Sequence, residues 1–149
     1  MSTLQRYSST ITHKMQLHAR LGEMLYISAS SSPDESVSTK RLSESMRRFC
    51  RSVELCDDYL RGYYGLKVTT KRLLDVLQKS TKTVAPTSEI EIPPPSTATA
   101  QRLHELATSK LAEAVRRSTA GERGWDGYDQ AEIIAARELL DRDMSDVQR

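Results

Sequence analysis

Residues 42–63, which read LSESMRRFCRSVELCDDYLRGY, decide the fold because apolar side chains recur in them at helical spacing. The steps between these side chains alternate between four and three residues, the period of one face of an α-helix. We call this set the seam: Leu42, Met46, Phe49, Val53, Cys56, Leu60 and Tyr63. Three consecutive heptads of this kind predict a surface that other helices must cover. Leu55 and Tyr59 broaden the stripe and favour a helical bundle over a two-stranded coiled coil.

We expect the seam to be too extensive for a chain of 149 residues to cover unaided, so that helices of other chains complete its cover. The only tryptophan lies in the turn-rich loop 121–127, where an exposed indole would make a good binding anchor. The alternative is that this tryptophan folds back and closes a helical hairpin. The predicted partner-binding residues are Leu42, Met46, Phe49, Val53, Leu60, Tyr63 and Trp125.

Two glycines within the predicted helix leave its continuity open. Gly62 and Gly65 each weaken a helix by about 1 kcal/mol relative to alanine, and they are candidates for a kink or a short turn. An unbroken helix from Pro33 to Lys79 would span about 70 Å at ~1.5 Å per residue and would indicate a rod-like subunit. A break at the glycines would instead turn residues 1–79 into a three-helix bundle.

The seam is preceded by a second amphipathic segment and by a helix start signal. Apolar residues recur at steps of three and four from about Thr3 to Ser28, which predicts a first helix. Ser32, Pro33 and Glu35 then form the pattern of a capping box with proline at the first helical position. We therefore expect the seam helix to begin at Pro33.

A proline-rich linker divides the chain. Residues 80–98 are rich in serine and threonine and contain Pro93-Pro94-Pro95, which no helix can cross. Beyond it, residues 99–149 predict an αα-hairpin whose second helix is capped by Asp126. The expected fold is all-α: an elongated helical bundle or coiled-coil-like part over 1–79, the linker over 80–98, and a C-terminal helical hairpin over 99–149.

Motifs that would carry catalysis are missing from the sequence. It contains no glycine-rich phosphate loop, no nucleophile motif and no histidine pair at metal-ligand spacing, so we expect no catalytic, cofactor-binding or metal-binding residues. Cys50 and Cys56 lie six residues apart, too far along a helix for a disulfide, and are expected to be packing residues. No apolar run approaches the ~18 residues of a transmembrane helix.

Charge is distributed unevenly along the chain. Residues 1–85 carry a net charge of +6 and residues 86–149 a net charge of −4. We predict a non-catalytic scaffold or adaptor subunit that binds other protein subunits through helix–helix packing, as a hetero- or homo-oligomer. The alternative is a nucleic-acid-binding accessory protein that uses the basic first half. The expected location is intracellular, cytoplasmic or nuclear, and the acid-free first 22 residues leave a mitochondrial presequence as an alternative.

Overall fold

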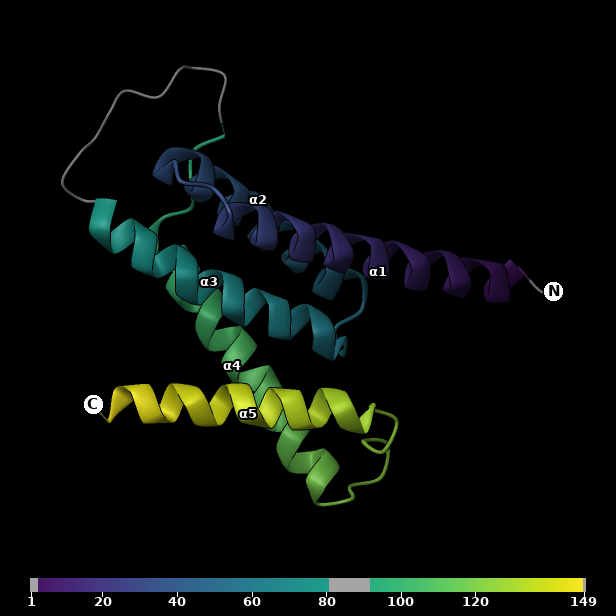
Figure 1. The fold of residues 1–149 in the computed structure, drawn as a ribbon. Helices are drawn as coiled ribbons and strands as arrows, with labels where there is room; N and C mark the ends of the chain where they lie inside the picture. Colours follow the sequence, from purple (N-terminus) through teal and green to yellow (C-terminus); the bar gives the residue numbers. More distant parts are fainter. Residues whose placement is uncertain (1–2, 81–91, 149) are drawn as a thin grey trace.

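Five α-helices make up the secondary structure of the described residues, 3–80 and 92–148, in this computed structural model (Figure 1). They are α1 (Thr3–Ser30), α2 (Glu35–Leu55), α3 (Leu60–Ser80), α4 (Thr97–Thr119) and α5 (Gln130–Val147). No strand occurs within these two ranges. The predicted all-α class is therefore confirmed.

Successive helices reverse direction and pack as antiparallel pairs. The pairs are α1 with α2 and α3 with α4, and α2 also packs on α3, which joins the two pairs. Figure 1 shows that α1, α3 and α5 run in the same direction, whereas α4 crosses steeply between α3 and α5. One face of the molecule is thus built from the three helices that share a direction.

The first break in the chain falls before the two glycines and not at them. Helix α2 ends at Leu55 with Cys56 as its C-cap, and α3 begins at Leu60 and continues through both glycines. The glycines instead permit close packing of α3 on α2. A Cβ added at Gly65 would lie 2.1 Å from Phe49 Cε1, and one at Gly62 would lie 2.7 Å from Val53 Cγ1.

Aspartates, and not the predicted residues, cap α2 and α5. The Asp34 carboxylate accepts hydrogen bonds from the amides of Ser36 and Val37, so α2 begins at Glu35 and the predicted Ser32 cap was wrong. Asp129 accepts from the Ala131 amide at 2.8 Å and takes the place predicted for Asp126. In each case the acid directly before the helix is the one whose side chain reaches the first free amides.

Helix α4 ends through a glycine. Gly121 has a φ of +67°, a left-handed conformation that a Cβ disfavours. Its amide donates to the Ser118 carbonyl, and the Glu122 amide donates to the Arg117 carbonyl. These two hydrogen bonds form a Schellman motif, which satisfies the last carbonyls of the helix and turns the chain towards α5.

The seam lies in the core and is covered by the chain's own helices. Leu42, Met46, Phe49, Leu60 and Tyr63 are all buried, whereas Val53 is partly buried. The expectation that the chain could not cover this surface unaided was wrong. Helix α1 covers one side of α2 and α3 covers the other.

The core extends across the predicted linker. Helix α3 packs on α4, and a single cluster of buried side chains includes Leu66 and Leu73 of α3 with Leu111 of α4 and Leu139 of α5. Residues 92–96, with the three prolines, form no helix or strand, and residues 81–91 lie outside the described part. The division into domains stays a prediction, but the two predicted units share this core.

Candidate functional site

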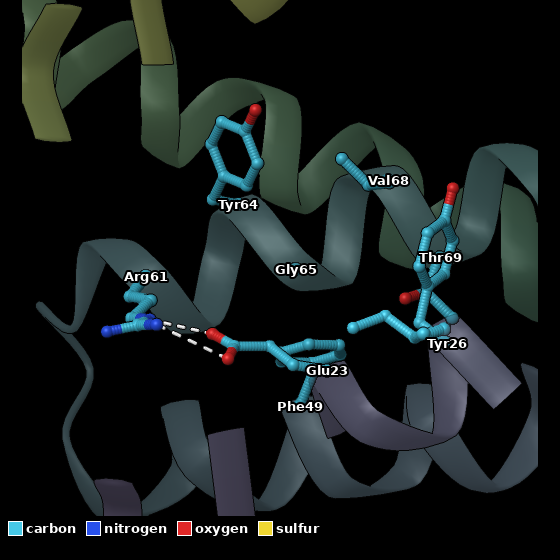
Figure 2. Close-up of a pocket in the computed structure, with 9 residues that line it drawn as sticks. Glu23, Tyr26, Phe49, Arg61, Tyr64, Gly65, Val68 and Thr69 are labelled. Carbon is cyan, nitrogen blue, oxygen red and sulfur yellow. Dashed lines mark hydrogen bonds and ion pairs between the residues drawn. The ribbon is translucent and has the colours of Figure 1, made fainter. Parts of the chain in front are cut away.

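A groove lies between α1 and α3, beside the core. It has a volume of about 410 Å³ (Figure 2). Phe49 of α2 and Gly65 of α3 lie at its floor, where the phenyl ring occupies the space that a Cβ on Gly65 would need. The walls are formed by Glu23, Tyr26, Ile27, Arg61, Tyr64, Val68 and Thr69. The groove therefore has an apolar and aromatic interior.

An ion pair closes one end of this groove. The Arg61 guanidinium binds the Glu23 carboxylate through two hydrogen bonds, Nε–Oε1 at 2.7 Å and Nη2–Oε2 at 3.2 Å, as the dashed lines in Figure 2 show. The hydrogen bond to Glu23 raises the pKa of Arg61. Because half of the Arg61 side chain is exposed, the pair contributes at most about 1 kcal/mol to stability and remains available to a ligand.

The groove continues from α3 onto α5. Arg61 and Tyr64 also line a depression of about 260 Å³ that reaches Ala131 and Glu132 of α5. A second depression of about 280 Å³ shares Tyr26 and Val68 with the first groove. Its walls are completed by Lys67, Lys71, Arg72, Asp75, Leu139 and Asp143. We call the three connected depressions the α1–α3–α5 groove.

Aromatic rings and charges alternate along this groove. The Arg72 guanidinium lies over the Tyr26 ring, 5.4 Å from its centroid, in a cation–π contact. Tyr64 lies between Arg61 and Val68 and is half-buried, with its ring directed away from the Glu23–Arg61 pair in Figure 2. Partly exposed tyrosines beside paired charges are the composition expected of a surface that binds protein segments.

A buried charge cluster fixes α5 beside the groove. Lys67 of α3, with 1% of its surface exposed, forms an ion pair with Asp143 of α5 and donates to Thr108 Oγ1 of α4 at 2.7 Å. Lys71 binds the other oxygen of Asp143. Burial opposes ionisation of Asp143, but hydrogen bonds from the two lysines hold its pKa below the usual value. Burial and the Lys67 charge lower the pKa of neighbouring His104.

The structure places most of the predicted partner-binding residues inside the molecule. Leu42, Met46, Phe49, Leu60 and Tyr63 have between 0% and 6% of their surface exposed. Of these, Phe49 forms the floor of the α1–α3–α5 groove and Leu60 lines its α5 end. The role of these residues in partner binding stays a prediction, since no partner is present to test it.

Val53 and Trp125 are the predicted residues that keep some exposure. Val53 packs against the core beside Gly62. The Trp125 ring is covered by the Arg117 guanidinium, 4.9 Å from its centroid, and lies 6.1 Å from the Tyr128 ring. Tyr128 Oη donates to the Asp58 carbonyl, which ties the loop to the α2–α3 turn. Trp125 thus packs back on its own hairpin, and its role as a binding anchor stays a prediction.

Three basic residues of the first half have acidic partners on α2. Arg47 and Arg48 share Glu44, and Arg51 pairs with Glu54. The nucleic-acid alternative stays untested. Cys50 and Cys56 are both free thiols, and burial is the main cause that raises the pKa of each to about 11. Thiols with such pKa values are poor nucleophiles at neutral pH.

Residues 3–80 and 92–148 contain neither a metal site nor a membrane-spanning helix. No group of three or more histidine, cysteine or acidic side chains is arranged to hold a metal ion in this part of the chain. Within the same residues, no helix combines the length and hydrophobicity that crossing a lipid bilayer requires.

The residues that line the groove were not predicted, because the prediction considered only one apolar face of each helix. Arg61, Tyr64, Val68 and Arg72 form a second stripe on α3 at steps of three, four and four, next to the seam stripe. This signal was available in the sequence. The pairing of Arg61 with Glu23, 38 residues earlier, was not, because it depends on how α1 packs against α3.

The two helical pairs repeat a packing pattern. In α2, Ser45 and Ser52 flank Phe49, and Ser45 Oγ donates to the Gly22 carbonyl of α1 at 2.7 Å. In α4, Ala107, Leu111 and Ala114 occupy the same spacing, small, large and small, and all are buried. Leu21-Gly22 on α1 and Ser45 four residues before Phe49 on α2 match features of the tetratricopeptide (TPR) repeat. The second pair shares only the spacing of small and large residues, because α3 has no leucine–glycine pair and Leu111 is not aromatic. The five helices are consistent with TPR-like helical hairpins.

Comparison with known proteins agrees with this class. The chain is 27% identical over 97 residues to the "TPR repeat protein oca3" of Schizosaccharomyces pombe (strain 972 / ATCC 24843). The aligned part covers 64% of this chain and 32% of that protein, about a third of its length. No family model and no solved structure matched the chain. This distant similarity agrees with the helical hairpins of the fold.

Proposed function

We propose that this chain is a non-catalytic adaptor or scaffold module that binds a segment of a partner protein in the α1–α3–α5 groove. The observation that carries the proposal is the continuity of the groove across three helices of common direction, with Tyr26 and Tyr64 on its walls. Similarity to a TPR repeat protein supports the same class of function.

The chemistry of the groove defines the partner segment. The apolar walls of the groove, formed by Tyr26, Ile27 and Val68, accept an aliphatic or aromatic side chain, whose burial would contribute about 1.5–3 kcal/mol. Glu23 and Arg61 at one end, and Arg72 farther along, offer hydrogen bonds to the backbone or to charged side chains of that segment. Both signs of charge are present, so we expect recognition by an apolar anchor with polar flanks.

Site-specific photocrosslinking tests this proposal. A benzoyl-phenylalanine replacing Tyr64 should trap a partner in cell extract, whereas the same label at Leu106, which is 44% exposed on α4 and lies outside the groove, should not trap it. With the trapped protein in hand, Tyr64→Ala should weaken binding by at least about 2 kcal/mol, roughly 30-fold, as loss of an aromatic hot spot does. Equal trapping at both positions, or unchanged affinity of a folded Tyr64→Ala variant, would contradict the proposal.

A further inference from the structure

The proline segment, which we define as residues 92–95, has a conformation that its sequence fixes. Each of Pro93, Pro94 and Pro95 holds its own φ at about −65° and disfavours the α-helical region for the residue before it. The left-handed polyproline II helix satisfies both constraints. The structure agrees, because the segment contains no helix or strand and the following Ser96 has φ −64° and ψ 151°, values of polyproline II.

The proline segment is apolar and largely open to solvent. Ile92 is 73% exposed, Pro93 and Pro94 are also exposed, and Pro95 is partly buried. A polyproline II helix rises ~3.1 Å per residue, so the segment presents an apolar ridge about 9 Å long. Because proline has no amide N–H, this ridge also offers backbone carbonyl acceptors without neighbouring donors.

The fold holds the proline segment in place at two points. Arg47 of α2 donates from Nη2 to the Pro93 carbonyl at 3.2 Å, and Figure 1 shows this stretch running past α2 into the start of α4. Directly after the segment, Ser96 Oγ accepts a hydrogen bond from the Thr99 amide at 3.1 Å and caps α4. The backbone is therefore ordered before any partner arrives, so binding costs little conformational entropy.

Two common modes of peptide recognition do not suit this segment. Addition as a strand to the edge of a sheet needs backbone N–H donors, which Pro93, Pro94 and Pro95 lack. Docking as a helix is excluded, because three successive prolines cannot form a helix interior. A third mode uses a groove lined by aromatic rings, which recognises a preformed polyproline II backbone. The exposed proline rings and the free carbonyls meet the requirements of this mode.

We infer that the proline segment is a docking site for a protein domain with an aromatic-lined groove for polyproline II ligands, as SH3, WW and EVH1 domains have. The exposed rings of Pro93 and Pro94 enter such a groove, and Ile92 packs at its edge. No residue of the segment lines the α1–α3–α5 groove. The docking site is therefore independent of the function proposed for that groove.

An array of purified SH3, WW and EVH1 domains, probed with the fluorescently labelled full chain, tests for this docking site. The chain should bind at least one domain, and an excess of that domain's own proline-rich ligand peptide should displace it. Nuclear magnetic resonance of the isotope-labelled domain should then show the largest shifts at the aromatic residues of its groove. Failure of the wild-type chain to bind any domain, or binding that the peptide does not displace, would overturn the inference.

Substitutions in the proline segment locate the contact on the chain. Pro93→Ala/Pro94→Ala/Pro95→Ala removes the exposed rings and the fixed backbone, and it should weaken binding by more than about tenfold. Ile92→Asp changes a 73% exposed side chain, so it should weaken binding while circular dichroism shows the helix content of the wild type. A triple variant or an Ile92→Asp variant that binds as tightly as the wild type would contradict the assignment.

Two control variants separate this site from the rest of the molecule. Pro33→Ala changes an exposed proline in the turn between α1 and α2 and should bind the domain as the wild type does. Tyr64→Ala changes the α1–α3–α5 groove and should also leave this binding intact. If Tyr64→Ala abolished binding of the domain, the contact would belong to that groove and the inference would be wrong.

Discussion

The contact between Gly65 and Phe49 gives the sharpest test of how α2 and α3 are held together. The Phe49 side chain is 2% exposed, and a Cβ on Gly65 would lie 2.1 Å from its Cε1 and 2.3 Å from its Cζ. The ring cannot move aside, because a Cβ placed on Gly22 across the ring would lie only 2.9 Å from Cε2. Gly65→Ala therefore forces α3 away from α2 by more than 1 Å, since carbon atoms in contact lie about 3.5–4.0 Å apart.

Two opposing terms set the size of the effect. Overpacking of a core costs about 1–3 kcal/mol, and a ring confined on both sides places Gly65→Ala at the upper end of that range. Alanine gains about 1 kcal/mol over glycine in the middle of a helix. The net loss in the free energy of unfolding should be about 2 kcal/mol, or about 4–8 °C in Tm for a chain of this size.

Thermal and urea unfolding, followed by circular dichroism, measure this loss. Gly127→Ala is the matched control, because a Cβ there meets no atom within 4 Å, and it should change stability by less than about 0.5 kcal/mol. In a double-mutant cycle, Phe49→Leu should relieve the clash, so that the combined loss is smaller than the sum of the single losses by at least about 1 kcal/mol. A Gly65→Ala variant as stable as the wild type, or strict additivity in the cycle, would refute the reasoning.

Three further perturbations test the α3–α4–α5 region. Asp143→Ala leaves Lys67 buried without its counter-ion and should lower the unfolding free energy by about 3 kcal/mol. Lys67→Met keeps the packing and should cost less. Urea titration measures both losses, and a larger loss for Lys67→Met would contradict a buried ion pair. Gly121→Ala places a Cβ on a left-handed residue and should cost about 1 kcal/mol in the same assay; no loss would mean that the Schellman turn is not required. Burial and the Lys67 charge keep the pKa of His104 below 6.5 in the folded state, so the unfolded chain takes up a proton first as the pH falls. Stability should therefore fall as the pH drops below 6.5, and His104→Gln should reduce this dependence. If the variant keeps the same dependence of stability on pH, other groups cause it.

Local rules predicted the elements of this fold but not the residues that delimit them. The seam stripe located α2 and α3 because burial on one face imposes helical spacing on any sequence. The caps were misplaced because several serines and acids near each helix start could serve, and the choice depends on which amide the packed chain leaves free. Asp34 and Asp129 cap the helices, whereas the sequence reading chose Ser32 and Asp126.

Tertiary packing decided what the glycines do. Gly62 and Gly65 were predicted as possible helix breaks, because helix propensity describes a residue in an isolated helix, without tertiary contacts. In the folded chain both lie against α2 side chains, and the cost in propensity is offset by the closer approach of two helices. A sequence reading that treats each helix alone cannot find this, because Phe49, the residue that needs the space, lies 16 positions before Gly65.

The position of the candidate site could not be predicted, because residue spacing shows which surfaces are apolar but not which helices cover them. A heptad stripe shows that a surface must be buried, but it does not show whose helix buries it, and in this chain α1 and α3 cover the seam. The α1–α3–α5 groove is an apolar surface that the helices line without filling. Because stacked helical hairpins commonly bind other proteins through their concave surface, this groove, and not the buried seam, carries the function proposed above.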